Sequence, residues 1–170
     1  MTRHATILLV DDSKDDIELM CLALARSHAP VRFACVTQGS EAIAYLSRRE
    51  KYADREQFPE PAIVLLDLAM PAMNGFDVLR WMQQQSVPMP PAFVLTCSQL
   101  ESDARLARDL GAAAFITKPM DLEGTIVLIE SMQNFWTWHA PEREPADPPT
   151  IVGTDERRIG SSERLPVPPL

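Results

Sequence analysis

Hydrophobic and polar positions follow one another along the chain in five repeating blocks, each a short apolar run followed by a segment of mixed polarity. The runs are apolar at consecutive positions, as strands covered by helices on both faces must be. They predict strands at 6–10, 31–36, 62–66, 92–96 and 113–117. The segments between them predict helices at 13–27, 39–48, 75–85, 99–110 and 121–138. This alternation predicts an α/β fold with a doubly wound parallel sheet of five strands and five helices.

Residues that favour helix ends mark several of these boundaries. Asn74, Ser98 and Asp121 precede predicted helices and are candidates for N-cap or near-cap positions. Gly111 follows a predicted helix and suits a helix stop. The connection 49–61 is polar and longer than most loops between a helix and a strand, so it interrupts the regular pattern.

Composition and charge narrow the class of protein. The chain has 170 residues, 46% of them hydrophobic, and a net charge of −8. It has no Lys/Arg cluster for nucleic acid, and no apolar run long enough for a membrane span or a signal peptide, so we expect a cytoplasmic protein without membrane or nucleic-acid partners. The segment 140–170 holds 7 of the 15 prolines and predicts a disordered tail after one folded domain at 1–139.

The three cysteines, Cys21, Cys35 and Cys97, have no CxxC spacing and stand in apolar surroundings. This pattern is typical of free, buried thiols in a reducing compartment. It predicts neither a disulfide nor a metal site made of cysteine.

Charged residues stand where the predicted strands end. Asp11 and Asp12 follow the first strand, Asp67 the third, and Lys118 the fifth, while Thr96 ends the fourth. Because the carboxyl ends of parallel strands meet at one edge of the sheet, these side chains are expected to lie together. Clustered carboxylates repel one another unless a divalent cation joins them, and oxygen ligands suit Mg²⁺. A carboxylate beside Mg²⁺ can attack phosphorus, so Asp67 is a candidate nucleophile.

Each of these residues also has a simpler explanation when taken alone. Asp11 and Asp12 could cap the first helix, Asp67 could be an ordinary loop acid, and Lys118 a solvated surface residue. Pro119 follows the lysine, so the bond between them is a candidate cis peptide bond. The combination is more specific than any member, because every residue falls at a strand end.

With these motifs the chain closely resembles the receiver domains of response regulators in two-component signalling, over about residues 5–138. The matching residues are Asp11-Asp12, Asp67, Met70-Pro71, Asn74-Gly75, Thr96-Cys97, Phe115 and Lys118-Pro119. The resemblance implies the flavodoxin-like strand order 2-1-3-4-5. It also implies a signalling module rather than an enzyme.

The same resemblance assigns expected roles. Asp67 would accept a phosphoryl group from a histidine of a sensor kinase. Mg²⁺ would be held by Asp11, Asp12, Asp67 and the backbone carbonyl of Ala69. Lys118 and Thr96 would contact the phosphoryl group. Thr96 and Phe115 would form the switch that alters the face made by segments 99–110, 113–117 and 121–138.

Finer features resemble stand-alone regulators paired with bacterial phytochromes. They are the segment Tyr52-Ala53-Asp54, the run from Asp67 to Pro71, and Asn134-Phe135-Trp136. This likeness implies a phytochrome kinase as partner and a homodimer. Trp136 and Trp138 would either anchor that dimer or pack the last helical turn onto the domain.

Two other functions fit parts of the pattern. An aspartate-nucleophile phosphatase would use the same magnesium chemistry, but such enzymes carry a second acid two residues on, where this chain has Ala69. A degenerate receiver acting as a scaffold without phosphate remains an alternative. A dinucleotide-binding domain is excluded, because Asp11-Asp12-Ser13-Lys14 replaces the glycine-rich turn that such domains need.

Overall fold

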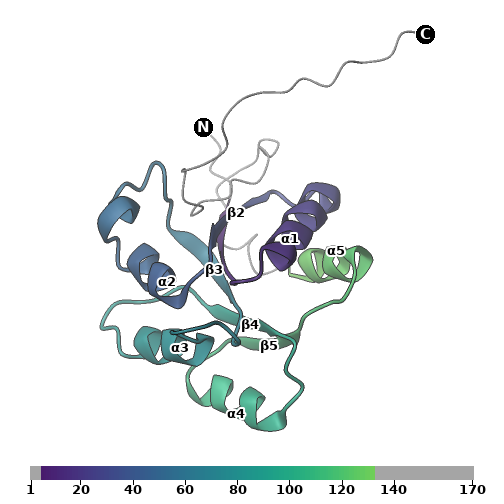
Figure 1. Ribbon diagram of the computed structural model, residues 1–170. Helices are drawn as coiled ribbons and strands as arrows, with labels where there is room; N and C mark the ends of the chain where they lie inside the picture. The colour runs from purple at the N-terminus through teal and green to yellow at the C-terminus, as the bar shows by residue number, and fades with distance from the viewer. Residues whose placement is uncertain (1–4, 133–170) are drawn as a thin grey trace, which may run out of the picture.

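Five parallel strands form one sheet with helices on both faces in the computed structural model, which describes residues 5–132 (Figure 1). The order β2-β1-β3-β4-β5 confirms the predicted doubly wound fold. The strands are β1 (Ala5–Val10), β2 (Val31–Val36), β3 (Pro61–Leu66), β4 (Ala92–Thr96) and β5 (Ala114–Thr117). The described helices are α1 (Lys14–Ser27), α2 (Gly39–Leu46), α3 (Gly75–Gln83), α4 (Glu101–Asp109), α5 (Leu122–Ser131) and the 3₁₀ helix η1 (Glu50–Ala53).

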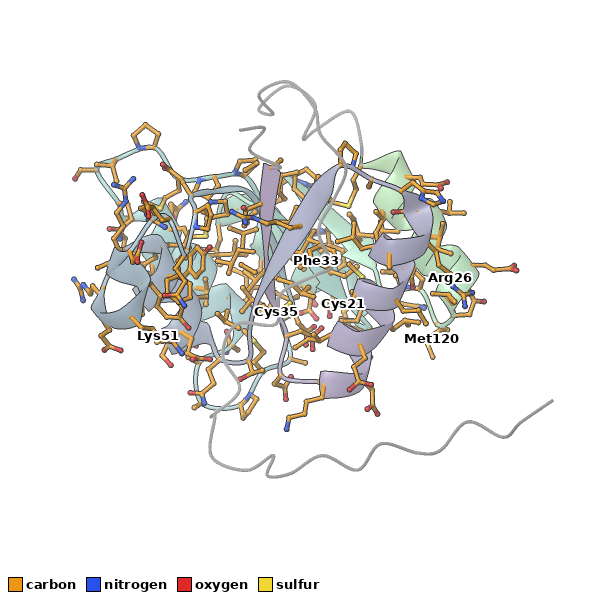
Figure 2. The ribbon with its side chains drawn as sticks, turned by 90° about the horizontal axis from the view of Figure 1, so that it is seen from above. Cys21, Arg26, Phe33, Cys35, Lys51 and Met120 are labelled. Carbon is orange, nitrogen blue, oxygen red and sulfur yellow. The ribbon has the colours of Figure 1, made fainter. Side chains whose placement is uncertain are left out.

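The helices divide between the two faces of the sheet. Helices α1 and α5 pack side by side on one face, and α2, α3 and α4 lie on the other (Figure 1). Figure 2 places Cys21 of α1 and Cys35 of β2 between the helix and the sheet, whereas Arg26 and Lys51 lie at the periphery. Two hydrophobic clusters, one per face, therefore hold the sheet between them.

Helix ends confirm most of the predicted boundary signals. Asn74 and Asp77 form a complete capping box at the start of α3, and the Asp121 side chain accepts from the N–H of Gly124 at the start of α5. Gly111 has φ 89°, a left-handed conformation that suits glycine after a helix. These local signals fix where the strand-to-helix loops begin and end.

Ser98 is not the N-cap residue of α4; it lies two residues before it, near the cap. Helix α4 begins at Glu101 with Leu100 as its N-cap residue, which makes no side-chain cap bond. The Ser98 hydroxyl instead accepts from the N–H of Leu100 and donates to Asp103, so it stabilises the turn before the helix.

The three cysteines differ in their exposure to solvent. Cys21 and Cys35 are buried as predicted, but Cys97 is exposed, because it follows β4 at the open edge of the sheet.

No peptide bond within residues 5–132 is cis, so the cis bond considered before Pro119 is not found. The end of the helix predicted at 121–138, with Trp136 and Trp138, and the tail 140–170 lie outside the described residues. Within the described part, no helix is long and apolar enough to cross a membrane.

The connection after α2 is more ordered than its polar composition predicts. It contains η1, and the rings of Tyr52 and Phe58 are buried against Tyr45 with centroid distances of 5.1 and 6.1 Å. The Tyr45 hydroxyl donates to the carbonyl of Pro59 at 2.8 Å, and that of Tyr52 to Glu41 at 3.3 Å. Three aromatic rings therefore hold this long connection against α2.

The two tyrosines of this cluster predict an unusual alkaline titration. Burial raises the pKa of Tyr45 from 10.0 to about 12 and, together with the Glu41 carboxylate, raises the pKa of Tyr52 further. Since unfolded tyrosines ionise first, the folded state binds more protons above pH 10, and stability is expected to fall as the pH rises from 10 to 12. The chain has only these 2 tyrosines, so tyrosinate absorbance measures them directly. Ionisation of both near pH 10 in folded protein would contradict the packing described.

Candidate functional site

The backbone fixes the residues predicted at the strand ends. The N–H of Asp11 donates to the carbonyl of the last residue of β2 at 3.1 Å, and that of Asp67 to the last residue of β1 at 2.9 Å. The N–H of Lys118 donates to the carbonyl of Thr96 at 2.9 Å. These residues continue the strand pairing by one step, so their side chains are held at one edge of the sheet.

Three carboxylates meet at this edge. Asp11, Asp12 and Asp67 each place a carboxylate oxygen within 4.8 Å of the other two. Asp11 and Asp67 are buried and Asp12 is exposed. The set offers hard oxygen ligands with access from solvent, which fits a divalent cation such as Mg²⁺.

Lys118 joins these acids from the loop after β5. Its ammonium nitrogen, Nζ, lies 2.7 Å from Asp11 Oδ2, 2.7 Å from Asp16 Oδ2 and 3.6 Å from Asp67 Oδ2. The lysine side chain is only 10% exposed, so water screens these ion pairs little. The predicted placement of the lysine beside the acids is confirmed.

Burial and ion pairing shift the pKa values of the charged groups in the site in opposite directions. Burial raises the pKa of Asp11 and of Asp67, and the neighbouring Lys118 only partly offsets it. For Lys118 burial alone would lower the pKa, but hydrogen bonds to Asp11 and Asp16 outweigh it and hold the pKa above the ordinary value. The buried acids therefore carry a charge that one lysine does not fully balance.

Sequence reasoning missed Asp16. It stands in the first turn of α1, three residues after the N-cap Ser13, and not at a strand end. A serine followed three residues later by an acid is a capping-box pattern, which turns the acid back toward the loop before the helix. That pattern was the signal that could have placed Asp16 near the site.

Several of the predicted residues line an open cavity of about 430 Å³. Asp67, Ala69, Thr96 and Lys118 line it. Thr96 is buried, and its hydroxyl accepts from the N–H of Ser98 at 3.2 Å. Phe115 does not line the cavity; it packs, half-buried, against the cluster under α2, α3 and α4. The structure thus brings together the predicted acids, Lys118 and Thr96, whereas Phe115 packs against the hydrophobic cluster and not into the cavity.

Comparison with known proteins identifies the family of this fold and site. The family model described as the response regulator receiver domain matches residues 7–130. The curated response regulator Rcp1 of Synechocystis sp. is 31% identical over 131 residues, which cover 76% of this chain and 87% of Rcp1.

Solved structures of similar proteins agree with this match. The phosphorylated cyanobacterial phytochrome response regulator RcpA is 33% identical, with a TM-score of 0.71 over 82% of this chain and 100% of that one. The bacteriophytochrome response regulator RtBRR is 35% identical, with a TM-score of 0.67 over 85% of each chain. Rcp1 in its Mn²⁺-bound form is 31% identical, with a TM-score of 0.66 over 78% of this chain and 94% of that one.

Proposed function

Because the chain belongs to the response regulator receiver domain family, a family of signalling proteins rather than enzymes, we propose that it accepts a phosphoryl group from a histidine kinase on Asp67. The observation that carries this proposal is the arrangement around Asp67. Its buried carboxylate lies close to two further acids and to the Lys118 ammonium, and Asp67 lines a cavity that is open to solvent.

The donor set fits a bound Mg²⁺. The carboxylates of Asp11, Asp12 and Asp67 would hold the ion, and the backbone carbonyl of Ala69, which borders the same cavity, would complete the protein ligands. When bound, Mg²⁺ neutralises the charge that develops on the phosphoryl oxygens. The related regulator Rcp1 has been crystallised with Mn²⁺, another oxygen-seeking divalent cation.

The phosphoryl transfer depends mainly on how the reacting groups are aligned. A carboxylate oxygen of Asp67 attacks phosphorus, and the bond between phosphorus and the kinase histidine breaks with its electron pair on the imidazole nitrogen, which takes up a proton. Lys118 offers its positive charge to the transferred group, and the Thr96 hydroxyl donates to a phosphoryl oxygen. The product is an aspartyl phosphate.

Phosphorylation would then change a distant surface through packing. As Thr96 moves toward the phosphoryl group, space opens behind it for the ring of Phe115. Phe115 belongs to β5, the edge strand between α4 and α5, so its movement alters the face made by these three elements. A partner that binds this altered face more tightly reads the signal.

We infer the partners of this protein from the response regulators that it resembles and from its exposed hydrophobic residues. RcpA is named a cyanobacterial phytochrome response regulator and RtBRR a bacteriophytochrome response regulator, which supports a phytochrome histidine kinase as the phosphoryl donor. Leu106 of α4 and Val127 of α5 are exposed hydrophobic residues, and we propose that they contribute to a homodimer formed through α4, β5 and α5. Light scattering of the phosphorylated and unphosphorylated protein measures that association.

Intact mass after incubation with acetyl phosphate tests the proposed function. With Mg²⁺ we expect one phosphoryl adduct, and without the metal we expect almost none, because the acids then repel the incoming phosphate. Absence of any adduct, with a folded protein that binds Mg²⁺, would instead support a receiver that acts as a scaffold without phosphate. Steady release of inorganic phosphate with many turnovers would support the phosphatase alternative.

A further inference from the structure

Asp16 has no role in the function proposed so far, yet it makes one of the two shortest contacts to Lys118. The Asp16 Oδ2 atom lies 2.7 Å from the lysine Nζ, and the Asp16 side chain is 40% exposed. The contact joins the first turn of α1 to the loop after β5, which are 102 residues apart in sequence. Asp16 also borders the cavity that contains Asp67.

The local structure frees the Asp16 carboxylate for this contact. In the capping box of α3, the N3 residue Asp77 accepts from the N–H of the N-cap residue Asn74. In α1 the equivalent N–H, that of Ser13, donates instead to Asp11 Oδ1 at 2.9 Å. The Asp16 carboxylate has therefore lost its usual capping partner and pairs with Lys118 instead.

The geometry around Nζ explains what this pairing does. An ammonium group has three N–H donors. Asp11 and Asp16 each lie at hydrogen-bond distance and account for two of them, whereas Asp67 at 3.6 Å is too far for a direct hydrogen bond. The third donor is thus left for a phosphoryl oxygen carried by Asp67, and the nucleophile itself is not tied to the lysine.

We propose that Asp16 is a positioning residue: it holds the Lys118 ammonium back from Asp67, so that the carboxylate stays free to attack and the lysine is aligned for the transferred group. This inference rests on the proposed function of Asp67 as the acceptor. Without Asp16, the ammonium would move toward Asp67 and pair with it directly. That pairing would lower the nucleophilicity of Asp67 in the unphosphorylated state.

Three variants test the proposal: Asp16→Ala, Asp16→Asn and the matched control Asp15→Ala. Asp15 is the neighbouring exposed acid in the same turn of α1. With acetyl phosphate and saturating Mg²⁺, Asp16→Ala should be phosphorylated roughly tenfold more slowly, the lower range for a charged hydrogen bond. Asp16→Asn should recover most of the rate, because its amide oxygen still accepts from the lysine. Asp15→Ala should match the wild type, and affinity for Mg²⁺ should stay within about twofold throughout.

A second measurement needs no phosphorylation. In crystal structures, Asp16→Ala should bring Lys118 Nζ within hydrogen-bond distance of Asp67, and Asp15→Ala should not. An unchanged distance to Asp67, or equal rates for the two alanine variants, would overturn the proposal. If the wild type accepts no phosphoryl group, the proposed function fails, and the crystal structures still decide whether Asp16 holds the lysine.

Discussion

Replacing Asp67 by asparagine is expected to abolish phosphorylation while leaving the domain folded and, without metal, more stable to heat. The amide has no nucleophilic oxygen of comparable charge, so no adduct forms. Its carbonyl oxygen can still accept from the N–H groups of Leu68 and Ala69, which bond to the native carboxylate. Since burial raises the pKa of Asp67, the charged form destabilises the folded state, and removing the charge should raise the melting temperature.

Magnesium should reverse this order of stability. The ion binds the folded wild type and stabilises it, whereas the Asp67→Asn variant has lost one ligand and gains less. Thermal melts with and without Mg²⁺ measure both effects, and Asp15→Asn, which removes an exposed acid from α1, is the control for net charge. A variant that melts lower than the wild type without metal would contradict the electrostatic account of the site.

Replacing Gly75 by alanine is expected to destabilise the domain severely and to impair phosphorylation with it. A Cβ atom at this position would lie 2.3 Å from the carbonyl oxygen of Asp67 and 2.9 Å from the Cα of Leu68. Both are backbone atoms of the loop after β3, so relief requires the loop that carries the acceptor to move. We expect a loss on the order of 3 kcal/mol in the free energy of unfolding.

Gly124→Ala provides a matched comparison. Its Cβ would lie 3.1 Å from Asp121 Oδ1 and from Pro119 Cβ, both side-chain atoms that can shift slightly. The higher helix propensity of alanine offsets the cost of that contact, so the free energy of unfolding should change by less than about 1 kcal/mol. Chemical denaturation of both variants gives the two values. Equal, small losses would show that the loop after β3 is not packed as closely against α3 as described.

The sequence predicted the sheet and most of the site because one rule links them. Asp11, Asp67 and Lys118 directly follow strands, and Thr96 ends one, so identifying the apolar runs also placed these side chains at a common edge. The rule says nothing of residues within helices. The rule could not place Asp16. Its contact with Lys118 depends on the backbone N–H of Ser13, which donates to Asp11 and not to the Asp16 carboxylate.

Tertiary packing also determines features that the local sequence pattern could not predict. Tyr52 and Phe58 stand in a polar stretch, and only the folded chain shows that their rings contact Tyr45. Cys97 follows an apolar strand yet is exposed, since the strand ends at the open edge of the sheet. Ser98 suits a helix cap by residue type, but its side chain is used by the turn that precedes α4.

Chemical mapping of the phosphorylated residue tests directly whether Asp67 is the phosphoryl acceptor. Borohydride reduces an aspartyl phosphate to an alcohol, and peptide mass analysis then locates the altered carboxyl group. After treatment with acetyl phosphate and Mg²⁺, we expect reduction at Asp67 alone, with Asp11 and Asp12 unchanged. Reduction at either of those two acids, or a phosphoryl group carried only by another residue type, would contradict this expectation.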